Sequence, residues 1–413
     1  MAKFTSPFLA LKYRDFRLLW IGSLISHIGS QMQIVAISWH VYILTHSAFS
    51  LALIGAARLV PLLLVSPISG IIADRYNRKI IVLISQTVQF FTTLILAALT
   101  FSSQINLLQI YIILIINSIA ISFDSPARQS MIPALVPPHV FRNALGLNTT
   151  MYNAAIVIGP SIAGFVIAFL GIGIVYLINA ISFVAVVIAI LMMRPLLKKI
   201  DKEKITFSLN SIKEGFSFVF KNPLISSSML LDFFATFFSS ATILMPIFAN
   251  DILKVGPQGL GFLYAAPSVG SVLVGFIYSA FHHVKNQGKI LLLSVLIYGM
   301  ATIFFAVSRT YYLSLFFLAI SGAGDAVSAI TRNSIRQLMT PDDMRGRMSS
   351  ISMIFYFGGP QLGEIEAGVV SGFWGATISV LTGGIGAVIA TIAIAYIYPQ
   401  IRRYQGHEIQ LTG

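Results

Sequence analysis

Four polar residues stand at matched positions within long apolar stretches of this sequence, where ionisable groups are costly. Each is ten or eleven residues from a basic flank: His27 from Arg17, Asn117 from Arg128, Asp232 from Lys221 and Asp325 from Arg336. At 1.5 Å per helical residue, all four lie roughly 15–17 Å from that flank, near the middle of a ~30 Å hydrocarbon layer. A carboxylate at that depth is costly unless it takes up a proton, so Asp232 and Asp325 suit proton uptake and release.

Polar stripes at helical spacing run through each of these residues. They comprise Ser23, His27, Gln31 and Ser38; Asn117, Asp124 and Arg128; Ser228, Asp232, Thr236 and Ser239; and Ser321, Asp325, Ser328 and Arg332. Two interpretations stay open. Either His27, Gln31, Asn117, Asp232 and Asp325 line a central cavity and couple protons, or their side chains form structural hydrogen bonds between helices.

The chemistry of an enzyme or a metal site is not indicated. No nucleophile triad or metal-ligand constellation accompanies the polar residues, and the pair His282 and His283 alone is weak for a metal. With no Cys, the chain has neither a disulfide framework nor a thiolate metal site. We therefore expect no cofactor, no metal and no reaction on a substrate.

Membrane-spanning helices must position these residues, and the composition indicates them. The 413-residue chain is 56% hydrophobic and 10% charged, with a mean hydropathy of +0.85, and each crossing needs about 20 apolar residues. An all-α membrane protein with twelve spans is predicted. The spans are 18–44, 50–72, 80–101, 107–127, 144–169, 173–193, 223–249, 259–281, 290–308, 311–331, 349–373 and 376–398.

The basic residues predict the topology. Nearly all of the 27 Lys and Arg residues lie in alternate gaps between the spans, so both termini are expected in the cytoplasm. A net charge of +13 could indicate nucleic acid, but basic residues confined to such gaps serve anionic lipid and topology, so no nucleic-acid partner is expected. The first span follows a charged segment and leads into further spans, which does not indicate a cleavable signal peptide.

Two halves are predicted on either side of a basic segment. The halves are 1–193 and 223–413, and the linker 194–222 contains an amphipathic pattern typical of an interfacial helix. Its apolar side holds Ile212, Phe216, Val219 and Phe220, and its polar side holds Lys213, Glu214, Ser217 and Lys221. The alternative is a solvated connector that merely tethers the halves.

The halves also repeat in sequence. A shift of 204 residues places Arg128 on Arg332, Ser130 on Ser334, Pro137 on Pro341, Gly159 on Gly363 and Gly164 on Gly368. A parallel duplication of six spans is typical of transporters that bind substrate near the midplane, between two halves that rock.

Several motifs resemble one family of transporters. The run Gly70-Ile-Ile-Ala-Asp74-Arg75-Tyr-Asn-Arg78-Lys79 resembles the signature loop of the major facilitator superfamily, with Asn77 in place of Gly. That departure is mild because Asn tolerates left-handed backbone. The runs 123–129 and 261–266, and Gly346-Arg347 after Pro341, resemble the branch of bacterial exporters that includes the enterobactin exporter and macrolide efflux proteins.

The resemblance implies the major facilitator fold of two six-helix repeats, with spans one, four, seven and ten around a cavity. It further implies a cytoplasmic latch, in which Asp74 contacts the other half and Arg78 pairs with Asp124. The alternative is that these charges only orient the loop during insertion. The full set of expected latch residues is Gly70, Asp74, Arg75, Arg78, Asp124 and Arg128.

Span five resembles an antiporter signature. Ala155, Gly159, Pro160, Ala163 and Gly164 match it, with two glycines replaced by alanine. Because Pro removes a helical donor and small residues let helices approach, Gly159, Pro160 and Gly164 predict a kinked, tightly packed helix. The motif fits proton antiport, or packing alone.

An outer gate is expected on spans two and eleven, which are neighbours in the resembled fold. Arg58 is sixteen residues before Asp74 and Glu364 is seventeen after Arg347, so both lie about 24–26 Å from the cytoplasmic side. Arg58 is expected to pair with Glu364 or Glu366. Since residues two apart point to nearly opposite sides of a helix, Arg58 can hold one of the two, unless it snorkels to the headgroups instead.

These expectations together predict a proton-coupled exporter of an amphipathic organic molecule, such as a drug or siderophore, in the bacterial inner membrane. Phe233, Phe234, Phe237 and Phe238 on span seven fit organic cargo. An importer or facilitator of a lipid, small solute or metal ion is the alternative within transport, and a membrane sensor that moves no cargo is the alternative outside it. The expected partners are the organic substrate, protons and membrane lipids, and the chain is expected to be a monomer.

Overall fold

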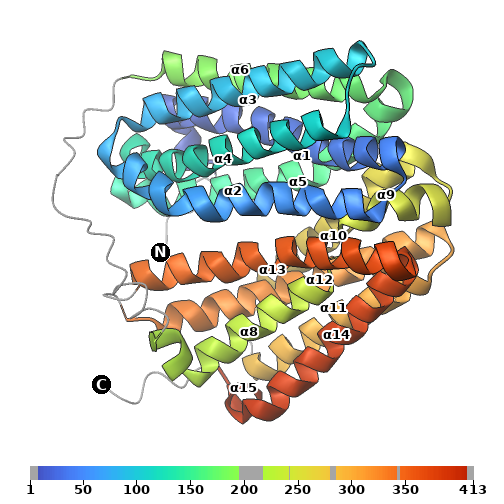
Figure 1. Cartoon of the computed structure of the whole chain (residues 1–413). Helices are drawn as coiled ribbons and strands as arrows, with labels where there is room; N and C mark the ends of the chain where they lie inside the picture. The colour runs from blue at the N-terminus through green and yellow to red at the C-terminus, as the bar shows by residue number, and fades with distance from the viewer. Residues whose placement is uncertain (1–7, 195–216, 241, 280–284, 342–344, 407–413) are drawn as a thin grey trace. The chain divides into compact units, whose positions relative to one another are not determined.

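The described chain is helical throughout its regular elements (Figure 1). The computed structural model describes residues 8–194, 217–240, 242–279, 285–341 and 345–406. Up to residue 192 the elements are η1 (Leu9–Lys12), α1 (Arg14–Thr45), α2 (Ala48–Arg75), α3 (Arg78–Phe101), α4 (Leu107–Leu135), η2 (Pro138–Val140), α5 (Phe141–Leu170) and α6 (Ile172–Met192). From residue 223 they are α8 (Pro223–Phe238), η3 (Thr242–Leu244), α9 (Met245–Ile247), the π-helix η4 (Phe248–Ile252), α10 (Gly256–Ser279), α11 (Gln287–Val307), α12 (Tyr311–Met339), α13 (Arg345–Trp374), α14 (Ala376–Ile397) and α15 (Pro399–Arg403).

The chain forms two compact units. The first comprises residues 1–44 and 57–205, and the second comprises residues 45–56 and 206–413. The first turns of α2 thus belong to the second unit, where Phe49 packs edge-on against Phe373 of α13 with ring centroids 5.3 Å apart. The predicted boundaries of the linker stay a prediction, because residues 195–216 lie outside the described ranges.

The predicted repeat is confirmed by the helix bounds. Helices α4 and α12 have equal lengths and are displaced by 204 residues, and so are α5 and α13. The turns that follow α5 and α13 match as well, since Gly171 and Gly375 have φ values of +86° and +87°. Glycine adopts this backbone conformation without the steric cost that an L side chain adds. Two copies of one supersecondary pattern therefore form the two units.

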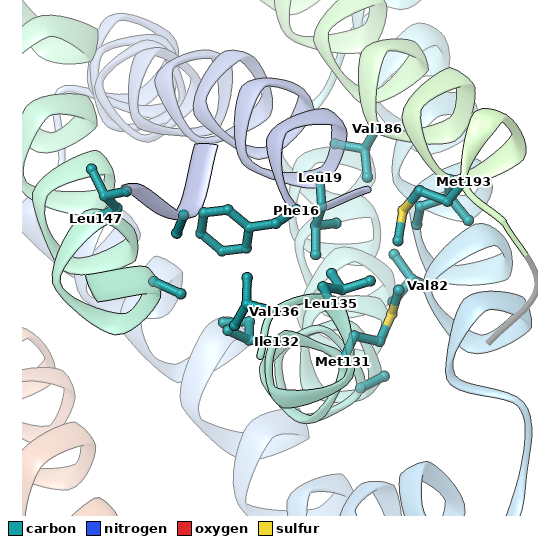
Figure 2. Packing of buried hydrophobic residues seen from close by; sticks show 14 of the residues in the cluster. Phe16, Leu19, Val82, Met131, Ile132, Leu135, Val136, Leu147, Val186 and Met193 are labelled. Atoms are coloured by element: carbon teal, nitrogen blue, oxygen red, sulfur yellow. The ribbon is translucent and has the colours of Figure 1, made fainter. Parts of the chain in front are cut away.

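The first unit has an apolar core at one end of its helices (Figure 2). Phe16 and Leu19 of α1 pack there with side chains from α3, α4, α5 and α6, among them Val82, Met131 and Val186. Further along α1, Gly29 faces Asn179 and Ser182 of α6. Core packing and close glycine contacts together fix α1 within this unit.

Ten helices of the described residues meet a length and hydropathy criterion for membrane spans, against twelve spans predicted. The two others, α1 and α13, have 32 and 30 residues and are long enough to cross. Polar residues interrupt both of them; α1, for example, carries His27, Gln31 and Gln33. Helices that shield polar side chains inside a bundle need not be apolar all round.

Span seven departs from the prediction of one helix over 223–249. Helix α8 ends at Phe238, and three short helices, η3, α9 and η4, then follow one another directly. Ser239, Ser240 and Pro246 lie in this region, and such residues favour local turns over a continuous helix. Of the predicted linker helix, residues 217–221 are described and helical, with Val219 buried and Phe220 exposed, whereas Ile212 and Phe216 lie outside the described residues.

Candidate functional site

A cluster of charges in the second unit joins two helices. Arg332 of α12 forms an ion pair with Asp232 of α8, with 2.7 Å between Nη2 and Oδ1. The same Nη2 is 3.7 Å from Oδ1 of Asp325, two turns earlier on α12. Arg332 also donates a hydrogen bond to Ser328, four residues earlier. The helical spacing of Asp325, Ser328 and Arg332 aligns their side chains on one face of α12, beside α8.

The two carboxylates in this cluster differ in exposure. The side chains of Asp232 and Arg332 are 14% and 12% exposed, whereas that of Asp325 is 45% exposed. The two carboxylates share one guanidinium as their ion-pair partner, and a second cation, Arg336, acts on Asp232 electrostatically from one turn further along α12. Arg332 is therefore placed to pair with either carboxylate, and a role of this cluster in proton coupling stays a prediction.

Aromatic side chains follow Asp232 directly in the chain. Phe233 stacks on Phe237 with ring centroids 6.0 Å apart and meets Phe355 of α13 edge-on at 6.0 Å. Phe233, Phe234 and Phe237 are all half-buried. An apolar surface beside charged groups is the usual lining of a site for an organic ligand.

The first unit has an equivalent cluster with one carboxylate instead of two. Arg128 of α4 forms an ion pair with Asp124, four residues earlier, at 2.6 Å, and its Nη1 donates to Ser23 Oγ of α1 at 2.6 Å. Gln86 of α3 donates to Asp124 at 3.1 Å. One cation here meets one carboxylate, both buried and both hydrogen-bonded, so this cluster is balanced without a proton.

The partner of Asp124 differs from the predicted one. Arg78 was expected to pair with it, but Asp124 is bound by Arg128, and Arg78 donates to the carbonyl oxygen of Ser130 at 2.8 Å. The reason is geometric: Arg128 is one helical turn from Asp124 on the same face of α4. Arg78 instead joins the start of α3 to α4.

The remaining latch residues are only partly described. The side chain of Asp74 lies outside the described residues, so its contact with the other half stays a prediction. Arg75 is exposed and Gly70 has open space around its Cα. Asn77 does not use left-handed backbone; its φ is −65°, and its side chain caps α3 by accepting a hydrogen bond from the Lys79 N–H at 3.0 Å.

Three further residues of the expected cavity set belong to the first unit. Asn117 is buried and donates to the carbonyl oxygen of Ile113 on its own helix at 3.1 Å, a bond that joins no second helix, so its role stays a prediction. His27 meets Tyr152 of α5 edge-on, with ring centroids 5.3 Å apart. Gln31 is half-buried and its Cβ lies at the contact with Gly159. These contacts join α1 to α5.

The antiporter-like motif forms a close helix contact. A Cβ on Gly159 would lie 2.5 Å from Gln31 Cβ and 2.8 Å from the carbonyl oxygen of Ile28, both on α1. Helix α5 continues through Pro160, and Pro160 and Gly164 are buried. Gly363, the repeat equivalent of Gly159, approaches α8 in the same way, since a Cβ added there would lie 2.2 Å from the Phe237 oxygen. Packing therefore explains the small residues, and a role in antiport stays a prediction.

The expected gate residues fall in different units. Arg58 is a half-buried residue of α2 in the first unit, and Glu364 and Glu366 are half-buried residues of α13 in the second. Within the second unit, Glu364 Cβ would lie 3.3 Å from a Cβ on Gly55 of α2. The pairing of Arg58 with Glu364 or Glu366 stays a prediction.

Sequence reasoning missed the partner of Asp232. Arg332 had been placed on the polar stripe of its span and on the repeat of Arg128, but no rule of spacing joins α12 to α8. The sequence repeat could have indicated this pair, because Arg128 and Arg332 occupy equivalent positions. Arg128 reaches α1 in the first unit, and Arg332 reaches α8 in the second. Sequence reasoning also missed a buried hydrogen-bond network in the first unit. There Gln33 Oε1 accepts hydrogen bonds from Thr93 Oγ1 at 3.2 Å and from Asn179 Nδ2 at 2.5 Å.

Comparison with known proteins agrees with this architecture. Residues 5–408 match the profile of the transmembrane secretion effector family, MFS_3. The chain belongs to this family of the major facilitator superfamily. The enterobactin exporters EntS of Shigella boydii serotype 18 and Escherichia coli O127:H6 are each 25% identical over 402 residues, which cover 96% of this chain and 95% of theirs.

Solved structures of other major facilitator proteins share the fold. A bacterial homologue of the human lysosomal transporter Spinster superposes with a TM-score of 0.70 at 16% identity, covering 95% of this chain and 97% of its own. A POT family transporter superposes with a TM-score of 0.74 at 12% identity, covering 94% and 96%. This major facilitator protein is therefore a multi-pass membrane transporter and not an enzyme.

Proposed function

We propose that this transporter exports an amphipathic organic molecule in exchange for protons across the bacterial cytoplasmic membrane. The contact of Arg332 with both Asp232 and Asp325 carries the proposal, because protonation of one carboxylate would leave Arg332 to pair with the other. The enterobactin exporters support export of an organic cargo. The half-buried Phe side chains of α8 give such a cargo an apolar surface beside the charges.

In this mechanism the proton and the cargo compete for the charge cluster. A proton that enters from outside binds the more exposed Asp325 or reaches Asp232, and Arg332 then rests on the carboxylate that stays ionised. Loss of that proton to the cytoplasm restores the competition of the two carboxylates for Arg332. Proton entry is coupled to cargo export if the transporter changes conformation readily in only some of these charge states.

Flux in proteoliposomes tests the proposal. Uptake of enterobactin driven by an imposed pH gradient should fall at least about tenfold in Asp232→Asn and Asp325→Asn, because an amide cannot cycle a proton. Exchange of labelled for unlabelled cargo without a gradient should persist in Asp325→Asn, because exchange needs no net proton movement. The matched control is Asp251→Asn, which removes a carboxylate of η4 outside the cluster.

The outcomes also separate the alternatives. Gradient-driven uptake that survives in both single variants and in the double variant would eliminate these carboxylates as the proton carriers. Wild-type flux that follows the cargo gradient alone would indicate a facilitator. Absence of flux for enterobactin and for amphipathic dyes would favour a sensor.

The topology belongs to the same proposal. Both termini are cytoplasmic, since the basic residues gather in the gaps between spans that this orientation places inside. Labelling of single cysteines introduced at Lys12 and at Arg309 in intact cells tests it, and the expected result is labelling at Arg309→Cys alone.

A further inference from the structure

A basic hollow lies at the end of the second unit where α8 begins and α12 and α14 end. Its volume is about 670 Å³. Its polar lining is Lys221, Asn222, Gln400 and Arg403, and none of its described lining residues is acidic. The hollow stands apart from the charge cluster of Arg332, and transport as proposed above makes no use of it.

The rest of the lining is apolar. Phe218, Leu224 and Met339 contribute it, from the helical turn 217–221, from the start of α8 and from the end of α12. These are the ends of membrane-spanning helices, so the hollow lies at the depth of the lipid headgroups. A site at that depth with two cations on an apolar floor is complementary to an anionic, amphipathic molecule.

The element that carries Arg403 is held in place. Ile401 and Tyr404 are buried against α11, and Gly288 of α11 donates a hydrogen bond to the Tyr404 carbonyl oxygen at 3.0 Å. A Cβ on Gly288 would lie 1.6 Å from the Ile401 oxygen, so α15 can sit this close only against glycine. With Ile401 and Tyr404 inward, Arg402 and Arg403 are exposed.

We infer that this hollow binds the phosphate headgroup of an anionic phospholipid. Lys221 and Arg403 would face the phosphate, Asn222 and Gln400 would offer hydrogen bonds, and the glycerol and first acyl carbons would lie on Phe218, Leu224 and Met339. A soluble phosphate ester shares the headgroup chemistry but gains nothing from the apolar floor. The bound lipid would link the last turn of the linker to α8, α12 and α15, and so hold the end of the linker on the second unit.

Native mass spectrometry of the purified full-length transporter tests this inference. Dioleoyl phosphatidylglycerol should bind more tightly than dioleoyl phosphatidylcholine, and glycerol 3-phosphate should not displace it. Lys221→Gln with Arg403→Gln should weaken binding of phosphatidylglycerol about 25-fold, at roughly fivefold for each basic residue at an anionic surface. The charge-preserving pair Lys221→Arg with Arg403→Lys should keep most of the affinity.

A matched control separates this hollow from general surface charge. Lys289→Gln with Arg402→Gln removes the same two charges from exposed residues outside the hollow, and Arg402 lines a different, apolar hollow of about 270 Å³. The control should bind phosphatidylglycerol like the wild type. The inference is wrong if the control loses as much affinity, if Lys221→Gln with Arg403→Gln loses none, or if glycerol 3-phosphate competes fully.

The melting temperature of each variant monitors its folding. If Lys221→Gln with Arg403→Gln is unstable, the affinity of the charge-preserving pair for phosphatidylglycerol decides whether the inference holds. These readouts need no transport. A failed lipid-binding test therefore does not contradict the proposed export, and a failed flux test does not contradict the lipid site.

Discussion

Arg128 and Arg332 occupy equivalent positions in the repeat, but their positive charges are neutralised in different ways. Both reach back to the side chain four residues earlier on their own helix, which is Asp124 in the first unit and Ser328 in the second. Because Ser328 carries no charge, Arg332 takes its counter-ion from α8, where Asp232 lies 2.7 Å away. A charge pair on one helix is a fixed part of that helix, whereas a pair between two helices can be broken when the helices move.

The first unit should depend on its pair for stability. Asp124→Asn leaves the buried Arg128 without a counter-ion, which costs up to about 3–5 kcal/mol where desolvation is complete and less where water enters. We expect a clear loss of thermal stability in detergent. The control is Asp15→Asn, which breaks the exposed pair with Arg14, 3.4 Å apart, and should cost about 1 kcal/mol or less. Equal melting temperatures for the two variants would contradict the structural role of Asp124.

At the scale of helices, α5 and α13 make the same contact in both units. Each brings a glycine, Gly159 or Gly363, against the first helix of its half, α1 or α8. The approach is too close for a Cβ at either position. The glycines therefore set the distance between helices, as small residues do in other membrane bundles.

Adding one carbon should test this contact. Gly159→Ala places a Cβ against Gln31 and Ile28 and should destabilise the protein by about 1–3 kcal/mol, the usual range for overpacking. Gly146→Ala on the same helix is the control, because a Cβ there has open space and Ala favours helix over Gly. Thermal unfolding of both variants measures the difference. A Gly159→Ala protein as stable as Gly146→Ala would show that α1 and α5 can separate at no cost.

The sequence predicted most of the helices but few of the contacts between them. Hydropathy and the 204-residue repeat predicted the helices, because each crossing must be apolar and equivalent helices share their lengths. They could not predict the break after Phe238, which depends on local turn chemistry at Ser239 and Ser240. Nor could spacing along one helix identify the pair of Arg332 and Asp232, because the partners are far apart in sequence and meet only through packing. Asn77 shows a further limit, since a residue tolerant of left-handed backbone served as a cap instead.

At the scale of the whole molecule, the expected gate on α2 and α13 can be tested by exchanging charges. Arg58→Glu should abolish most transport, because it places like charges at the pair expected from the sequence. Combination with Glu364→Arg or with Glu366→Arg should restore activity for the true partner, as measured by flux in proteoliposomes. If neither exchange restores flux, and Arg58→Ala leaves the accessibility of outer-facing cysteines unchanged, Arg58 has another role, such as snorkelling to the headgroups.

Helix α2 belongs in part to each of the two units. It is one unbroken helix over 48–75, yet its first turns are grouped with α13 and its remainder with the first unit. The division falls between Ala56 and Ala57, and Pro61 stands four residues beyond it. A proline has no N–H to donate, so the Ala57 carbonyl lacks its regular helical partner there. The helix is therefore easier to bend near this boundary than elsewhere. A bend there would leave the contact of Phe49 with Phe373 intact.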